Sequence, residues 1–199
     1  MHRPVVRPYL PSAPVSRLVL VRHGPTAATR SSSFPADEGV DADAIAGAVA
    51  LGRRLPTGAI AFSSPALRAR QTADAAGLTP KIDERLGECD FGSWSGRSLA
   101  ELHAEDPAAT EIWMTDPSAA PHGGESLNAF GARVRAWVDA QANQDTTVVA
   151  VTHSGVIAAA VAHVLGAPAE AVWSLRPEPL TITELDGADG RWTVRRVGA

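Results

Sequence analysis

Three apolar segments of strand type alternate with helical segments along this chain, and the alternation constrains the fold more than any other feature. The strand-type segments are RLVLV at 17–21, AIAFSS at 59–64 and TTVVAVT at 146–152. The segments with helical spacing or helical end signals are 41–55, 65–77, 126–141 and 154–166. Strands that alternate with helices pair in parallel, and the helices cover both faces of the sheet. We therefore predict an α/β fold, a three-layer α/β/α sandwich with a mostly parallel sheet.

The remaining segments fit into one domain. They predict a short strand near 81–83, a loop at 28–39, short helices at 98–106 and 109–114, and a closing hairpin of 180–185 with 191–197. With 199 residues and 45% hydrophobic composition, the chain can bury one core. We predict a single domain at 17–199 that carries a small cap insertion at about 97–125, and a flexible, proline-rich N-terminal tail at 1–16.

The net charge, the lengths of the apolar segments and the cysteine content limit the partners and the compartment that we expect. The net charge is −4, so the surface lacks the broad positive field that nucleic acid or an anionic membrane requires. No segment approaches the roughly 18 apolar residues of a membrane span. Cys89 is the only cysteine, which rules out an intramolecular disulfide and fits a reducing compartment. We expect a cytoplasmic protein without nucleic-acid or membrane partners.

The carboxyl ends of the apolar strands carry cationic and imidazole side chains. The first strand leads directly into Arg22 and His23, the second into the segment of Arg68, and the third into His153. In a parallel α/β sheet these strand ends meet at one edge, where ligands bind. An arginine presents a planar fork that matches phosphate oxygens, and a buried arginine without an anion is costly. The pattern predicts a phosphate-type anion site at this edge.

An acid is the remaining ingredient for proton transfer at such a site. The glycine-rich stretch at 84–96 supplies Glu88, and Asp90 lies two residues further on. The spacing alone does not choose between these two carboxylates.

Five of these motifs, taken together and in order, are similar to one family. LVLVRHGPT, SSPALRARQTA, LGECDFGSWSG, HGGES and VTHSG resemble the histidine phosphatase superfamily, which includes the cofactor-dependent phosphoglycerate mutases, over about residues 17–166. Within it, the third motif resembles those of small phosphatases, among them α-ribazole and sugar phosphatases.

The resemblance implies a mechanism and assigns roles to residues. His23 is expected to be the nucleophile that becomes a phosphohistidine, and Glu88 the general acid. Arg22, Arg68 and a protonated His153 are expected to surround the phosphoryl group, without a metal or other cofactor. The substrate is then expected to be a small-molecule phosphomonoester.

This chain departs from the family pattern on one side of the pocket. An asparagine that often contacts phosphate in the family is replaced by Thr29, so that Thr29, or the hydroxyl of Thr26, is expected to supply a donor. Ser154, directly after His153, is also expected to bind substrate. The glycine, aspartate and leucine pattern before the first long helix is missing, which predicts an altered pocket rim.

Other functions fit the residues less well. A cysteine phosphatase needs an arginine six residues after its nucleophile, and Ser95 stands six after Cys89. A nucleophile elbow needs a glycine two residues before Ser154, which this chain lacks. A phosphate-binding loop of the nucleotide type needs a lysine in a glycine-rich loop, and no such lysine is present.

Within the family, mutase activity is the main alternative, and it is disfavoured because the cap insertion is predominantly acidic. A non-catalytic phospho-ligand binding module is a third reading. The sequence does not identify the substrate. The exposed edge of the closing hairpin could pair two subunits, so we expect a homodimer.

Overall fold

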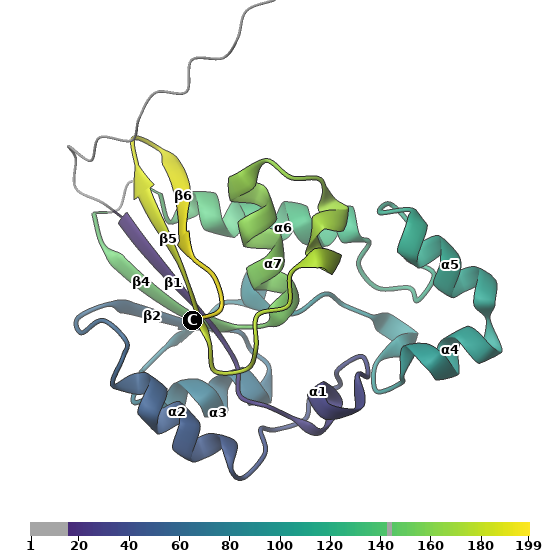
Figure 1. The fold of residues 1–199 in the computed structure, drawn as a ribbon, viewed down its shortest axis with the longest axis horizontal. Coiled ribbons are helices and arrows are strands. Elements are labelled where there is room, and N and C mark those ends of the chain that lie inside the picture. Colours follow the sequence, from purple (N-terminus) through teal and green to yellow (C-terminus); the bar gives the residue numbers. More distant parts are fainter. Residues whose placement is uncertain (1–15, 143–144) are drawn as a thin grey trace, which may run out of the picture.

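The computed structural model describes residues 16–142 and 145–199, which form a six-stranded sheet with helices on both faces (Figure 1). The strands are β1 (Ser16–Arg22), β2 (Ile60–Ser63), β3 (Lys81–Ile82), β4 (Thr147–Thr152), β5 (Ile182–Ala188) and β6 (Arg191–Arg196), in the spatial order β3-β2-β4-β1-β5-β6. The pairs β1–β4, β2–β4 and β2–β3 are parallel, whereas β5 runs antiparallel to β1 and to β6. The predicted mostly parallel sheet is confirmed.

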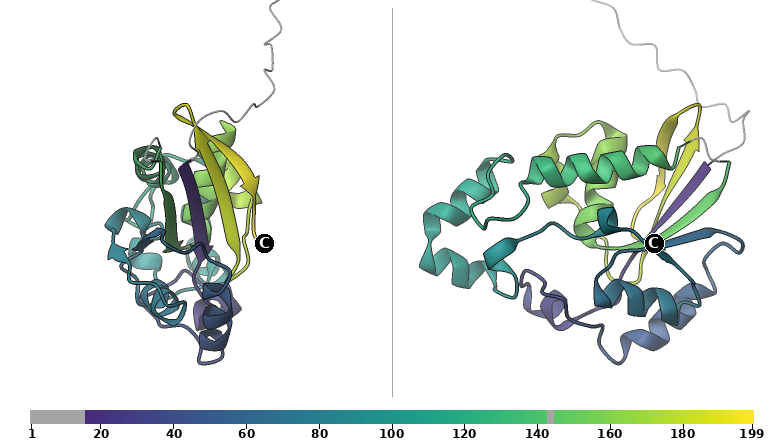
Figure 2. Two further views of the ribbon diagram at one scale, coloured as in Figure 1. Left: turned by 90° about the vertical axis from the view of Figure 1, so that its left-hand side faces the viewer. Right: turned by 180° about the vertical axis from the view of Figure 1, so that it is seen from behind.

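Alternating side chains of the central strand divide the core between two layers. Leu18 and Leu20 of β1 belong to the cluster that packs against α6 (Leu127–Ala140) and α7 (Ser154–Leu165). Val19 and Val21 point to the other face, toward α2 (Ala44–Gly52) and α3 (Leu67–Ala75). Burial of both faces explains why β1 and β4 are continuous apolar runs. The three predicted layers are seen along the sheet in Figure 2.

The register of the sheet aligns the strand ends. Arg22 at the end of β1 lies opposite Thr152 of β4, and Ser63 of β2 lies opposite Val151. The residues that follow these strands therefore emerge at one level of the same edge.

Two boundaries differ from the sequence prediction. The expected loop at 28–39 begins with a short helix, α1 (Ala27–Ser31), because Thr26 and Thr29 form a reciprocal capping box that starts it. The hairpin loop expected at 186–190 is shorter, since β5 continues to Ala188 and a two-residue turn follows. Asp189 and Gly190 in this turn have φ values of 51° and 71°, which is typical of the tight hairpin turns whose twist matches the strands.

The predicted N-terminal tail falls almost entirely outside the described residues. Of residues 1–16, the structure describes Ser16, which is the first residue of β1.

The cap insertion projects from the strand-end side of the sandwich and has a small core of its own (Figure 1). It contains α4 (Leu99–Glu105) and α5 (Pro107–Thr115), in agreement with the short helices expected there, and the 3-10 turn η2 (Gly92–Trp94) precedes it. Trp94, Leu102 and Trp113 are buried together in this core. Trp113 also contacts Trp173 of η3 (Ala169–Ser174), with ring centroids 4.6 Å apart, which joins the cap to the sandwich.

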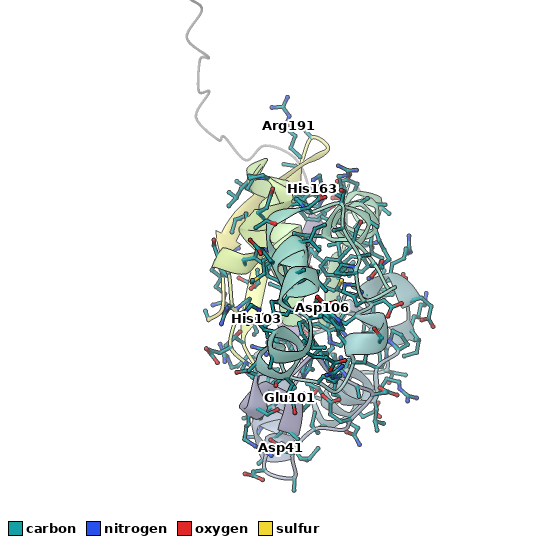
Figure 3. All side chains as sticks on the ribbon, turned by 90° about the vertical axis from the view of Figure 1, so that its right-hand side faces the viewer. Asp41, Glu101, His103, Asp106, His163 and Arg191 are labelled. Atoms are coloured by element: carbon teal, nitrogen blue, oxygen red, sulfur yellow. The ribbon has the colours of Figure 1, made fainter. Side chains whose placement is uncertain are left out.

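Acidic side chains lie at the cap end of the molecule, where Glu101 and Asp106 are labelled in Figure 3. Both begin helices: Glu101 completes the capping box of α4, and Asp106 accepts a hydrogen bond from the first turn of α5. Among the described residues, no helix is long and apolar enough to cross a membrane.

Candidate active site

Two buried histidines meet where β1 and β4 end. His23 directly follows β1, and its backbone N–H donates to the Thr152 carbonyl at 2.9 Å. His153 directly follows β4 and occupies the N-cap position of α7. The two imidazole rings are 5.1 Å apart between centroids, and both are almost fully buried. The structure therefore brings together the two histidines that the sequence placed at separate strand ends.

Hydrogen bonding fixes the tautomer of His23. Its Nδ1 lies 2.7 Å from the carbonyl oxygen of Gly24, and because a carbonyl only accepts, Nδ1 carries the proton. The lone pair is then on Nε2. Burial lowers the pKa of His23 to about 3, and the positive charges of Arg68 and Arg22 act in the same direction. His23 is consequently a neutral imidazole with a free lone pair at physiological pH.

Burial favours the neutral form of His153 as well. The protonated form predicted from the sequence concerns a bound phosphate dianion, and it stays a prediction. Burial lowers the pKa of His153 well below the usual value, and His23 and Arg68 add to the shift. Its Nε2 lies 2.7 Å from Oγ of Ser64, which already accepts a hydrogen bond from the Ala66 backbone N–H. Among the described residues no other acceptor is recorded for the Ser64 hydroxyl hydrogen, so we assign this hydrogen to Nε2, which places the His153 proton on Nδ1. This Nδ1 is buried and has no protein partner.

The two predicted arginines are each held by one backbone carbonyl. Arg68 is 4% exposed, and its Nη1 donates to the Ala36 carbonyl at 2.7 Å. The Arg22 Nη1 donates to the Pro177 carbonyl at 2.6 Å. The Nε of each is buried without a partner. Glu38 is the nearest acidic side chain to Arg68, at 4.0 Å.

Glu88, rather than Asp90, contacts the start of α7, two residues after His153. Its two carboxylate oxygens accept hydrogen bonds from the backbone N–H groups of Cys89 at 3.0 Å and Gly155 at 3.1 Å. Burial raises the pKa of Glu88, although these two hydrogen bonds and the nearby arginines oppose the shift. Asp90 is exposed and accepts from the Gly92 backbone N–H. These contacts make Glu88 the candidate acid of the site, and its role stays a prediction.

A cavity of about 500 Å³ extends from Arg68 and Glu88 toward the cap. Its wall is formed on one side by Pro35, Ala36 and Asp37 and on the other by the stretch from Gly87 to Phe91, with Ser95. Such a volume suits a small organic ligand.

The last two predicted substrate-binding residues have less direct positions. Ser154 is the first residue of α7 and is partly buried beside His153. The Thr29 hydroxyl donates to the Thr26 carbonyl at 2.7 Å and accepts from the Thr26 backbone N–H at 2.8 Å. The Thr26 hydroxyl donates to Glu38. Both threonine hydroxyl hydrogens are therefore engaged, and a contact with substrate remains a prediction for each.

Sequence reasoning missed three supporting residues. Ser64 orients His153, Gly155 binds Glu88, and Arg133 holds the backbone of the Glu88 segment. Ser64 and Gly155 lie within motifs that the sequence analysis singled out, SSPALRARQTA and VTHSG, but neither was given a role. Arg133 lies on α6, far along the chain from Glu88, and no local signal points to it.

Among the described residues, no group of three or more histidine, cysteine or acidic side chains is placed to hold a metal ion.

The fold and the site together define an α/β enzyme that handles a phosphate-type anion. The model of the histidine phosphatase superfamily (branch 1) matches residues 18–199. Glucosyl-3-phosphoglycerate phosphatase of Mycobacterium tuberculosis is 35% identical over 173 residues, covering 76% of this chain and 76% of the relative. The protein of the same description from Mycolicibacterium vanbaalenii is 36% identical over 175 residues, covering 78% of this chain and 77% of the relative.

Solved structures agree with the match. The alpha-ribazole phosphatase from Shigella flexneri superimposes with a TM-score of 0.81 at 27% identity, covering 92% of this chain and 96% of that chain. The mycobacterial glucosyl-3-phosphoglycerate phosphatase in complex with VO3 gives a TM-score of 0.75 at 32% identity, covering 92% of this chain and 99% of that chain. The chain belongs to branch 1 of the histidine phosphatase superfamily, and it is a phosphatase.

Proposed function

We propose that this phosphatase hydrolyses small phosphomonoesters through a phosphohistidine formed at Nε2 of His23. The observation that carries the proposal is a set of unpaired buried nitrogens. Six buried side-chain nitrogen or oxygen atoms of the described residues lack a hydrogen-bond partner, and three of them are Nε of Arg22, Nε of Arg68 and Nδ1 of His153. Buried donors without partners are costly, and the oxygens of a phosphoryl group would satisfy all three.

In the first step, Nε2 of His23 attacks phosphorus, the N–P bond forms and the ester P–O bond breaks. The two arginines and His153 hold the non-bridging oxygens as charge redistributes in the transition state. A dianionic substrate favours protonation of His153, because it opposes the burial that keeps the free imidazole neutral. Protonated Glu88 donates its proton to the departing alkoxide, a role that its raised pKa suits.

In the second step, Glu88 is a carboxylate and accepts a proton from water. The water oxygen attacks phosphorus, the bond to Nε2 breaks, and inorganic phosphate leaves with Glu88 again protonated. No metal ion enters either step, because the fixed cations stabilise the transferring group.

Several finer points belong to the same proposal. We assign substrate contacts to Arg22, Arg68 and Ser154, and we favour hydrolysis over mutase transfer. The named relatives, glucosyl-3-phosphoglycerate and alpha-ribazole phosphatases, support a small phosphorylated metabolite as substrate. Cytoplasmic location and a homodimer stay predictions.

Replacement of the nucleophile tests the mechanism. His23→Ala should lower hydrolysis of an aryl phosphate in chelator-containing buffer by at least about 10⁴-fold, because no other group replaces the attacking nitrogen. His163→Ala is the matched control, since His163 is the imidazole near the other end of α7, where it pairs with Asp139.

Two further measurements complete this test. Rapid acid-free quenching should trap a phosphorylated protein whose label maps to His23 and is absent in His23→Ala. Incubation with 3-phosphoglycerate should release inorganic phosphate, whereas 2-phosphoglycerate as the main product would establish mutase transfer. Undiminished hydrolysis by His23→Ala would contradict the mechanism, and no turnover of any phosphomonoester by the wild-type protein would favour a binding module.

A further inference from the structure

We infer that Arg133 is a positioning residue for the general acid Glu88. It fixes the backbone that carries Glu88, so that its loss should slow the reaction only where the leaving group needs a proton. This inference rests on the proposed role of Glu88.

The Arg133 guanidinium, which projects from α6, makes five hydrogen bonds. Nη1 donates to the carbonyls of Arg85 at 2.8 Å and Gly87 at 3.0 Å, and Nη2 donates to the carbonyl of Glu88 itself at 3.2 Å. One side chain therefore holds three carbonyls in a span of four residues, and the last of them belongs to the general acid.

Glu125 binds the opposite side of the guanidinium, and the Arg133–Glu125 pair forms a clamp on the segment of Glu88. Its two carboxylate oxygens accept from Nε of Arg133 at 2.8 Å and from Nη2 at 2.6 Å. The same carboxylate accepts from the Asp90 backbone N–H, and the Glu125 backbone N–H donates to the Asp90 carbonyl at 2.8 Å. The Arg133–Glu125 ion pair therefore binds the backbone on both sides of Glu88, at Gly87 and at Asp90.

The clamp matters because residues 87–91 form neither helix nor strand. An irregular segment has no internal ladder to hold it, so its carbonyls need partners from elsewhere. Thr152 supplies one for Leu86 at 2.7 Å, and Arg133 supplies the next two. A general acid must lie within hydrogen-bond reach of the leaving oxygen, and a shift of about 1 Å is costly.

A lysine at position 133 cannot make the same set of hydrogen bonds. The arginine fork directs its N–H groups at the carboxylate and at three carbonyls simultaneously, whereas an ammonium offers three donors from a single atom. Arg133→Lys keeps the charge and most of the buried stem, and it removes the geometry. This substitution therefore isolates positioning from charge.

The experiment compares two phosphate esters by kcat/KM, which covers only the steps up to departure of the leaving group. For an alkyl phosphate, whose alkoxide must be protonated, Arg133→Lys should lower kcat/KM by about 10²-fold, at the lower end of what a general acid contributes. For 2,4-dinitrophenyl phosphate, whose phenolate leaves without a proton, the loss should stay within about threefold. Glu125→Gln should show the same selectivity, because it replaces one of the two oxygens that hold the guanidinium with an NH₂ group, which cannot accept a hydrogen bond.

Arg135→Lys is the matched control, since Arg135 is an exposed arginine two residues further along the same helix. It should leave both esters unaffected. Glu88→Gln provides the benchmark, with a large loss on the alkyl ester and a small one on the activated ester.

The possible outcomes separate this inference from the mechanism. An equal loss on both esters in Arg133→Lys, or no loss on either, overturns the positioning role even when Glu88→Gln behaves as stated. Equal losses on the two esters in Glu88→Gln would instead contradict the proposed general acid, and the positioning role with it.

Discussion

Each ring nitrogen of the two buried histidines has a role set by its neighbour. Nδ1 of His23 is occupied by the Gly24 carbonyl and Nε2 of His153 by the Ser64 hydroxyl. The remaining nitrogens are an acceptor on His23 and a donor on His153. In the proposed mechanism, the nucleophile and the oxyanion donor are therefore two identical side chains that differ in their hydrogen-bond partners.

Thr29 is the predicted site residue whose observed contacts favour a structural role. Thr29→Val keeps the β-branched shape and removes the hydroxyl that bonds to the Thr26 backbone. We expect the free energy of unfolding to fall by about 1 kcal/mol, the usual cost of a lost helix cap. The KM for an aryl phosphate should change by less than about twofold. Urea denaturation and steady-state kinetics measure the two effects.

Thr57→Val, in an exposed turn, is the control for loss of a threonine hydroxyl and should change neither quantity. If Thr29→Val instead raises the KM tenfold without loss of stability, the hydroxyl leaves Thr26 to bind substrate, as the sequence predicted.

Residue-scale prediction from sequence succeeded where chemistry and strand ends coincide. Arg22 ends β1, and His23 and His153 directly follow β1 and β4, so a buried strand pattern was enough to place them. Arg133 could not be found this way, because its role depends on carbonyls brought to it by the tertiary fold. The protonation state of His153 was also beyond the sequence, since burial decides it.

At the scale of elements, hydrophobic period and end signals predicted the strands and long helices to within about three residues. Local hydrogen bonding sets the start of α1, which was not expected, and the end of β5, which lies three residues beyond the expected one. The capping box of Thr26 with Thr29 starts a helix in a stretch rich in serine. The turn at Asp189 and Gly190 needs only two residues, so glycine-rich sequence before it remains in the strand. The amino-acid composition suggests a loop in both places. Local hydrogen bonding instead forms a helix in the first and extends the strand in the second.

The start of α7 needs a glycine at position 155, because the Glu88 carboxylate occupies the space that a side chain there would fill. A Cβ there would lie 2.2 Å from Oε1 of Glu88, and the Gly155 N–H is one of the donors to that carboxylate. We expect Gly155→Ala to displace Glu88 and to lower kcat/KM for an alkyl phosphate by about 10²-fold, in line with loss of a general acid. Steady-state kinetics with the purified variant measures the loss.

Gly131→Ala is the matched control for this substitution. Gly131 lies inside α6, and its added Cβ would meet nothing within 4 Å. This variant should retain full activity and gain about 0.5–1 kcal/mol of stability from better helix propensity. Full activity in Gly155→Ala would show that Glu88 tolerates the displacement and is not held as described.

At the scale of the whole molecule, the site is a region where folding keeps ionisable groups in their uncharged forms. His23 and His153 are buried as neutral imidazoles, and burial raises the pKa of Glu88. The sandwich supplies this environment by burying both faces of the sheet, while the cap has a separate core. Activity and global stability are therefore linked through the same groups.

This linkage predicts an acid-labile fold. The folded-state pKa of His23 is lowered to about 3 from its unfolded value near 6.5, so below pH 6.5 the unfolded chain binds a proton that the folded chain does not. The free energy of unfolding should then fall as pH drops from about 6.5 to about 3, by up to about 1.4 kcal/mol per pH unit for this imidazole, and His153 adds to the slope in the same direction. Glu88 has the opposite sign, because a raised pKa costs stability only as pH rises above its unfolded value.

Urea denaturation of His23→Asn between pH 6 and pH 4 measures the effect. The variant should lose stability less steeply than the wild type, by up to about 1.4 kcal/mol per pH unit, because it no longer contains the imidazole that resists protonation. His163→Asn, which removes the imidazole labelled in Figure 3 that pairs with Asp139, is the control for loss of a histidine outside the site. Parallel slopes for the wild type and His23→Asn would mean that His23 is protonated in the folded protein, and a protonated imidazole has no lone pair with which to attack phosphorus.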